Sequence, residues 1–175
     1  MTTAMTDRPK LRAELNPADV VVWVDPREQK PYHGSPLTFV LNTLDTGDYA
    51  LACAPDLLRI ERKELSDFVA CCGNERERFM REMTRIKAFT IPIVLIETTW
   101  NQLAAGGWRS QISPASVFGT AVGLLADGIN VICGGDRMQS EDLCKRILYT
   151  AARRRWREAR EWVKSLTGTE GQPDE

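Results

Sequence analysis

The sequence contains a single histidine, His33, among its 175 residues. This scarcity excludes zinc proteases of the HExxH type, nucleases of the HNH type and any metal site built from several histidines. The five cysteines are odd in number and form no CxxC pair, so neither a zinc ribbon nor a disulfide framework is expected. Chemistry in this chain must therefore depend on carboxylate, lysine and arginine side chains.

Long apolar runs are also missing. No run of about 18 apolar residues is present, which excludes a membrane-spanning helix. The N-terminus lacks an apolar core segment, so we expect no secretory signal peptide. Together with the unpaired cysteines, these absences predict a cytoplasmic protein. The length and the 43% hydrophobic fraction fit one ordinary globular domain.

The formal net charge of −1 conceals an uneven distribution. Residues 145–164 hold eight basic side chains, whereas the last residues of the chain carry three acidic ones. A near-neutral total neither supports nor excludes a polyanionic partner. We expect a loose arm over residues 1–19, one domain over residues 20–166 and an acidic disordered tail over residues 167–175.

Short apolar runs bounded by turn residues predict strands, and patterns with the helical period predict helices. In chain order the expected elements are strands at 20–24, 37–41, 49–53 and 57–62, helices at 65–72 and about 74–89, a strand at 91–97, a helix at about 113–126, a strand at 129–133 and a helix at about 140–166. The expected N-caps are Asn74, Ser113 and Ser140. The first four strands are expected to form a β-meander. The order predicts an α/β domain with a mixed sheet and helices on both faces.

Three acidic residues, Asp25, Asp48 and Glu61, lie at or near the ends of predicted strands. Each has an ordinary explanation, because acidic residues often cap turns and Glu61 could form a surface ion pair with Lys63. Alternate strand residues project to the same face about 6.6 Å apart, so Glu61 and Lys63 would lie side by side. Carboxylates on neighbouring strands can hold magnesium, and a lysine beside the metal can stabilise charge on a phosphate. The four residues together favour phosphodiester hydrolysis.

Five short motifs resemble the XPF-type nuclease domain, over roughly residues 20–135. They are VDPRE at 24–28, GDYAL at 47–51, ERKELSDF at 61–68, ERERF at 75–79 and VLIE at 94–97. The shared core, GD…ERKxxxD, is complete in this chain. The resemblance implies the restriction-endonuclease-like fold of the PD-(D/E)XK superfamily, with a mixed central sheet flanked by helices on both faces. It also implies a metal-dependent DNA endonuclease.

The resemblance implies a role for each matching residue. Asp48, Glu61 and the backbone carbonyl of Arg62 would hold magnesium, for which manganese is expected to substitute. Lys63 would be the catalytic lysine, and Asp25 would support the metal directly or through water. The positions expected to shape the site or to contact DNA phosphate are Arg27, Glu28, Arg62, Asp67 and Arg78, with Arg76 as the competing alignment for Arg78.

Further arginines are candidates for DNA contact. Arg81 and Arg85 share one helix face with Arg78. Arg109 and Ser110 lie on a glycine-rich loop before a helix N-terminus, where a phosphate could bind. A solvent-facing loop explains this last pair equally well.

The C-terminal helix is expected to carry an apolar stripe beside a basic stripe. The apolar stripe consists of Leu148, Ala152, Trp156, Ala159, Val163 and Leu166. The basic stripe consists of Arg153, Arg157, Arg160 and Lys164. The basic stripe predicts contact with the DNA backbone or, with equal weight, a solvated face. Because members of the XPF-type family pair their nuclease domains, the resemblance implies a homodimer, and we expect Trp156 or Trp162 to be an anchor of its interface.

The resemblance covers the nuclease domain alone. We expect no tandem helix-hairpin-helix modules of the eukaryotic and archaeal kind after residue 166. The sequence is more similar to compact forms from phages and prophages, which predicts a bacterial or phage-host cytosol. We expect a magnesium-dependent endonuclease for branched or junction DNA in repair, recombination or phage DNA processing, with no membrane and no small-molecule substrate. Two alternatives stay open: a catalytically silent DNA-binding partner with the nuclease fold, and a DNA-binding module whose acidic cluster is structural.

Overall fold

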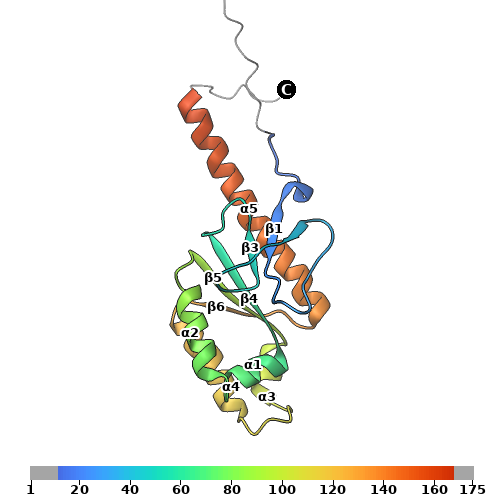
Figure 1. The fold of residues 1–175 in the computed structure, drawn as a ribbon, viewed down its shortest axis with the longest axis vertical. Helices are drawn as coiled ribbons and strands as arrows, with labels where there is room; N and C mark the ends of the chain where they lie inside the picture. The colour runs from blue at the N-terminus through green and yellow to red at the C-terminus, as the bar shows by residue number, and fades with distance from the viewer. Residues whose placement is uncertain (1–11, 168–175) are drawn as a thin grey trace, which may run out of the picture.

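The computed structural model describes residues 12–167, in which a six-stranded sheet separates α5 from the other helices (Figure 1). The strands are β1 (Val21–Val24), β2 (Thr38–Leu41), β3 (Tyr49–Leu51), β4 (Leu58–Glu64), β5 (Ile91–Glu97) and β6 (Asn130–Cys133), in the sheet order β2-β1-β3-β4-β5-β6. β3 is antiparallel to both of its neighbours, and all other pairs are parallel. The predicted mixed sheet is confirmed.

Helices cover both faces of this sheet, as the sequence predicts. They are α1 (Leu65–Cys71), α2 (Arg76–Ile86), α3 (Trp100–Ala105), α4 (Pro114–Ala126) and α5 (Arg137–Thr167), with a 3-10 turn, η1 (Pro17–Asp19), before β1. Side chains alternate along β5. Ile93 and Leu95 pack with α5, whereas Val94 and Ile96 pack with α1, α2 and α4. β5 is therefore buried on both faces, which explains its continuous apolar sequence.

The first two strands differ from the expected β-meander. β1 and β2 are parallel, and β3 pairs antiparallel with the other side of β1. A parallel pair needs a connection of about a dozen residues, which the polar segment between Val24 and Thr38 supplies. We call residues 25–36 the crossover segment. The meander prediction is wrong for β1 and β2, whereas the predicted hairpin of β3 and β4 is confirmed.

α5 begins at Arg137, so the predicted cap at Ser140 is wrong. Asp136 and Gln139 form a reciprocal capping arrangement instead. The Gln139 N–H donates to Asp136 Oδ1 (2.8 Å), and the Asp136 N–H donates to Gln139 Oε1 (3.0 Å). The earlier start brings Arg137 to the end of the sheet.

Two other helix starts also test the predicted caps. Ser113 accepts the Ser116 N–H (3.2 Å) and caps α4 as predicted. α2 is preceded by Glu75 without a side-chain cap, so the predicted Asn74 cap is wrong. α3 was not predicted, although Thr99 starts it with a capping box.

The described part of the N-terminal segment lies along α5. Trp156 Nε1 donates to the Arg12 carbonyl (3.3 Å) and Arg160 Nη1 to the Ala13 carbonyl (2.6 Å). Arg157 pairs with the side chain of the next residue in that segment, Glu14 (3.5 Å). Residues 1–11 of the expected arm and residues 168–175 of the expected tail lie outside the described residues. The last turns of α5 extend beyond the sheet (Figure 1).

Within residues 12–167, no helix combines the length and the apolar character that crossing a membrane would require.

Candidate active site

A tight turn before β3 places Asp48 against β4. Gly47 has a φ of 73°, and a Cβ there would lie 2.6 Å from Cγ of Arg59, so the turn requires glycine. The Asp48 N–H donates to the Ile60 carbonyl (2.8 Å), and Asp48 Oδ2 accepts the Arg62 N–H (2.7 Å). The backbone of β4 therefore fixes both the main chain and the carboxylate of Asp48.

Glu61 and Lys63 project from the same side of β4, as the strand period predicts, and their side chains form an ion pair. Glu61 is only 3% exposed. Burial raises the pKa of Asp48, and burial together with the Asp48 charge raises the pKa of Glu61. Burial alone would lower the pKa of Lys63, but the charges of Glu61 and Asp48 raise it well above its usual value. Lys63 therefore stays protonated at neutral pH.

The chemistry of this donor set fits a magnesium ion. Arg62 N–H engages one Asp48 oxygen and Lys63 engages one Glu61 oxygen, which leaves one carboxylate oxygen of each residue without a hydrogen bond from residues 12–167. No cluster of three or more Asp, Glu, His or Cys residues in this part of the chain could hold a metal. Magnesium commonly takes one or two protein carboxylates and keeps several waters. Asp48 and Glu61 match that requirement.

Asp25 has a different set of contacts. Its Oδ1 accepts the Arg27 N–H (2.9 Å) and Nε (2.7 Å), and its Oδ2 accepts Arg27 Nη2 (2.9 Å) and the Leu44 N–H (2.8 Å). The bonds from Arg27 lower the pKa of Asp25 to about 2. Its backbone N–H donates to the Asp48 carbonyl (2.9 Å). These contacts disfavour direct metal ligation by Asp25 and assign it to holding Arg27 and the backbone at Asp48.

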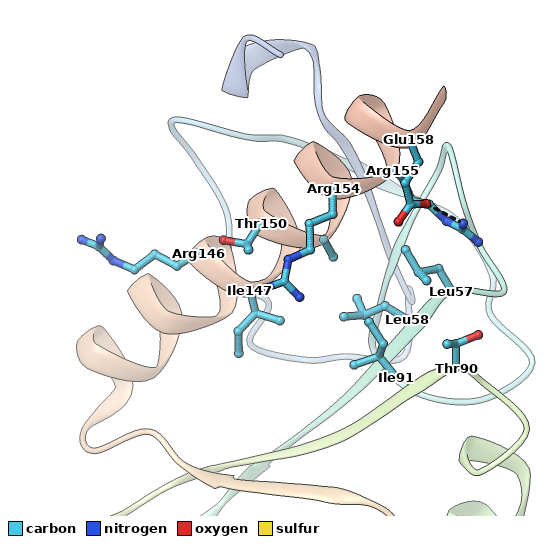
Figure 2. A pocket seen from close by; sticks show the side chains of 11 residues that line it. Leu57, Leu58, Thr90, Ile91, Arg146, Ile147, Thr150, Arg154, Arg155 and Glu158 are labelled. Carbon is cyan, nitrogen blue, oxygen red and sulfur yellow. Dashed lines mark hydrogen bonds and ion pairs between the residues drawn. The ribbon is translucent and has the colours of Figure 1, made fainter. Parts of the chain in front are cut away.

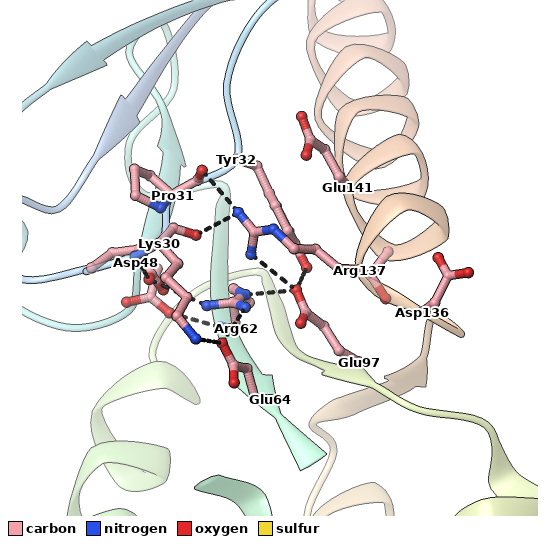
Figure 3. Close-up of polar contacts among 12 residues, drawn as sticks. Lys30, Pro31, Tyr32, Asp48, Arg62, Glu64, Glu97, Asp136, Arg137 and Glu141 are labelled. Atoms are coloured by element: carbon pink, nitrogen blue, oxygen red, sulfur yellow. Dashed lines mark hydrogen bonds and ion pairs between the residues drawn. The ribbon is translucent and has the colours of Figure 1, made fainter. Parts of the chain in front are cut away.

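Arg62 is a buried hub rather than a surface arginine. Its side chain is 4% exposed. Nε donates to Glu97 (2.8 Å), Nη1 to Glu28 (3.3 Å) and Nη2 to Glu64 (3.2 Å), as Figure 3 shows in part. Arg62 therefore joins β4, β5 and the crossover segment. Arg62 and Glu28 thus belong to one buried ion-pair network, and their expected roles in shaping the site or contacting DNA phosphate stay predictions.

The competing arginines of α2 point in different directions. Arg76 Nη1 donates to Thr120 Oγ1 (3.0 Å), which holds it against α4. Arg78 is exposed and pairs with Glu75. Arg81 and Arg85, which lie one turn apart, are exposed as well. Arg76 is thus engaged by α4 and Arg78 by Glu75, and the alignment of Arg78 with the motif arginine stays a prediction.

Glu82 is the site residue that the motifs did not identify. Its charge raises the pKa of Asp48, Glu61 and Lys63, and it also acts on Arg78, four residues earlier. Glu82, half-buried on α2, therefore lies near enough for its charge to act on the carboxylate pair. It lies beyond the ERERF motif. The sequence signal for it was its position four residues after Arg78, which makes the two side chains neighbours on the surface of a helix.

Three expected positions lie at the surface without a described contact to the carboxylate pair. Asp67 is exposed in the first turn of α1. Arg109 and Ser110 are exposed on the loop between α3 and α4, where Ser110 Oγ accepts the Ile112 N–H (3.3 Å). Their predicted contact with phosphate stays a prediction.

A cavity of about 550 Å³ lies on the opposite face of the sheet from Glu61, between α5 and the starts of β4 and β5 (Figure 2). Leu58 and Ile91 line it on the sheet side. On α5, Arg146 and Arg155 line it while paired with acidic neighbours on the same helix. This cavity is separate from the carboxylate pair and its lysine.

We expect Asp48→Asn to stabilise the protein in the absence of divalent metal. Asparagine can still accept the Arg62 N–H, but it removes a poorly solvated charge near Glu61. Because the raised pKa makes folding take up protons, the wild type loses stability as pH rises from the ordinary carboxyl pKa through the raised one. Thermal melts in EDTA at pH 8 should show a higher melting temperature for the variant, by about 2–4 °C for each kcal/mol gained in the free energy of unfolding. The increase should be smaller at pH 5. Asp67→Asn is the exposed control, and a lower melting temperature for Asp48→Asn at pH 8 would contradict the account.

Comparisons with known proteins agree with these observations. A family model described as the ERCC4 domain matches residues 24–149, which include the carboxylate pair, Lys63 and Arg137. No curated protein sequence matches the chain significantly. XPF from Aeropyrum pernix is a structural neighbour with a TM-score of 0.61 and 22% identity, over 86% of this chain and 75% of that chain.

A second structure, XPF from Aeropyrum pernix in complex with DNA, has a TM-score of 0.58 and 21% identity, over 76% of this chain and 64% of that chain. At these identities the neighbours establish the fold, and they confirm the restriction-endonuclease-like architecture expected from the motifs. The family match covers well over half of the chain. The protein therefore belongs to the ERCC4 domain family, the XPF-type nuclease domains.

Proposed function

We propose that the protein is a magnesium-dependent endonuclease that hydrolyses phosphodiester bonds in DNA. The observation that carries this proposal is the placement of Asp48, just before β3, near Glu61 and Lys63 on β4, where burial raises the pKa of both carboxylates. Such perturbed groups are typical of catalytic sites. Membership of the ERCC4 domain family supports the same activity.

The residues divide the chemistry between them. Asp48, Glu61 and the Arg62 carbonyl would hold magnesium, with manganese as a substitute, and the bound metal would lower the pKa of a water and offset charge on the phosphate. Lys63 keeps its proton because of the neighbouring carboxylates, so its Nζ can donate a hydrogen bond to a phosphate oxygen as negative charge develops there. Glu61 orients this lysine through their ion pair.

DNA is the substrate that the comparisons favour, because XPF from Aeropyrum pernix has been solved with DNA bound. On this chain the exposed arginines of α2 lie on the helix that also places Glu82 at the site. We infer that this face contacts the backbone of the cleaved DNA. We further propose that the protein selects branched or junction DNA, in repair, recombination or phage DNA processing. A catalytically silent partner is the alternative, and the complete carboxylate and lysine set argues against it.

The catalytic assignment predicts that Asp48→Asn and Lys63→Ala abolish cleavage while the protein stays folded. Removal of one central electrostatic group commonly lowers the rate 10²-fold or more. The assay uses labelled flap, fork, splayed and linear DNA with magnesium, manganese or EDTA, and Lys87→Ala is the control on an exposed lysine. Wild-type rates for both variants would refute the assignment. A wild-type protein that binds but never cuts these substrates would instead support the silent partner.

The α2 face predicts a measurable electrostatic contribution to DNA binding. Removing one arginine that neutralises a phosphate should lower the salt slope of binding by roughly 0.9. Arg81→Gln combined with Arg85→Gln should therefore weaken binding and reduce the slope by up to about 1.8, with little change in the single-turnover rate at saturating protein. The matched control is Arg154→Gln with Arg155→Gln, on the α5 side of the sheet. If both pairs of substitutions changed the affinity and the salt slope equally, the inference that α2 forms the binding surface would be wrong.

The basic stripe of α5 is less available for DNA than its sequence pattern indicates. Arg157 and Arg160 engage the N-terminal segment, and Arg153 lies 6.0 Å from the ring centroid of Tyr149. These contacts support the interpretation of the stripe as a surface that packs against its own chain. We therefore place the DNA contacts of this proposal on α2.

We also infer a homodimer in which Trp162 is an anchor. Trp162 is 64% exposed, and Leu166, one turn later, is 65% exposed, whereas Trp156 is half-buried and donates to a backbone carbonyl. Truncation of a tryptophan hot spot typically costs 2 kcal/mol or more of binding free energy, or about 30-fold in the dimer dissociation constant. Sedimentation at micromolar concentration should show Trp162→Ala shifted to monomer. Leu41→Ala, at an exposed position of the edge strand β2, should not shift, and a monomeric wild type would contradict the inference.

A further inference from the structure

We propose that Arg137, the first residue of α5, is a positioning residue of the nuclease site. It fastens the crossover segment to the ends of β4 and β5, and through that segment it orders Arg62. The activity readout of this inference rests on the proposed nuclease function. Arg137 belongs to no motif identified in the sequence.

Arg137 binds two backbone carbonyls and a carboxylate at once (Figure 3). Its Nη2 donates to the Lys30 carbonyl (2.9 Å) and the Pro31 carbonyl (3.2 Å), and its Nη1 donates to Glu97 Oε1 (3.4 Å). Its guanidinium also lies 5.1 Å from the ring centroid of Tyr32. A planar guanidinium with several donors can make these contacts together, and a lysine cannot.

Glu97 is the acceptor that connects Arg137 with the site. Its Oε1 accepts bonds from the Tyr32 hydroxyl (2.7 Å) and Arg62 Nε (2.8 Å) in addition to Arg137. The Glu97 side chain is 9% exposed, so these bonds form largely out of water and are stronger for it. One buried carboxylate thus joins α5, the crossover segment and β4.

The crossover segment is held at two places. At its start, Asp25 is fixed by Arg27 and by the backbone of Leu44. In its second half, Tyr32 is completely buried, its ring stacks on Tyr49 with 5.5 Å between centroids, and its N–H donates to the Tyr49 hydroxyl (2.7 Å). Arg137 adds the only side-chain donors that reach the carbonyls just before Tyr32 within residues 12–167.

The segment in turn holds Arg62 from the side of Glu28. Glu28 Oε1 accepts Arg62 Nη1 and the Lys30 N–H (2.7 Å), and Lys30 Nζ pairs with Glu64 (2.8 Å). Arg62 donates its backbone N–H to Asp48, and its carbonyl is a proposed metal ligand. Movement of the segment would therefore displace Arg62 and change the position of the metal donors.

The position of Arg137 on α5 distinguishes positioning from simple helix stabilisation. A cation in the first turn of a helix opposes the helix dipole. If Arg137 acted only on α5, alanine would be neutral or stabilising there. The contacts with the Lys30 and Pro31 carbonyls, 107 and 106 residues earlier in the sequence, give Arg137 a role outside its own helix.

The test compares Arg137→Ala and Arg137→Lys with Arg146→Ala, which removes an exposed arginine of α5 whose partner is Asp142. Residues that orient metal ligands typically affect metal affinity or activity by 10–100-fold. We expect Arg137→Ala to lower kcat about 10-fold or more, to leave KM for DNA within about twofold, and to raise the magnesium concentration for half-maximal rate. Arg137→Lys should recover part of the activity, and Arg146→Ala should match wild type.

Amide hydrogen exchange gives a second readout that needs no cleavage. In Arg137→Ala, residues 25–36 should exchange faster, including the Tyr32 amide, while β5 and the middle of α5 keep their protection. Unchanged exchange with unchanged kcat would overturn the inference, as would faster exchange throughout the chain or a rise in KM alone. If the wild type cuts no DNA, the proposed function fails, and the exchange result still decides whether Arg137 orders the segment.

Discussion

The close placement of two poorly solvated carboxylates, Asp48 and Glu61, is the constraint on which the rest of this structure depends. Glu61 is buried and Asp48 is half-buried near it, and their raised pKa values record the cost of that placement. Charges in such a place oppose folding unless a cation or a proton joins them. If the proposed function holds, the site is preorganised for a divalent cation at the expense of the stability of the free protein.

The surrounding framework holds these charges in place. The Gly47 turn brings Asp48 under the backbone of β4, and Arg62 connects β4 to β5 and to the crossover segment. Because β1 and β2 are parallel, the segment between them is long enough to cross the end of the sheet and to supply Glu28. The unexpected parallel pair is thus part of what completes the site, and α5 starts where its Arg137 can meet that segment.

The sequence predicted the strands and the Asp48, Glu61 and Lys63 arrangement because these depend on local periods and on spacing within a few residues. It did not predict Glu82, Tyr32 or Arg137, whose roles come from side chains that meet only after folding. It also did not reveal the contacts of Asp25, since motif position does not show that Arg27 and the Leu44 amide donate to its carboxylate oxygens. The basic stripe of α5 looked open in sequence because nothing local shows that residues 12–15 lie along it.

The most direct test of the central claim is a crystal structure of the protein with manganese, using its anomalous scattering to locate the metal. The account predicts a peak within coordination distance of an oxygen from Asp48, an oxygen from Glu61 and the carbonyl of Arg62, and no peak there in Asp48→Asn. A manganese peak in the wild type that avoids both carboxylates, in a preparation that cuts DNA, would contradict it.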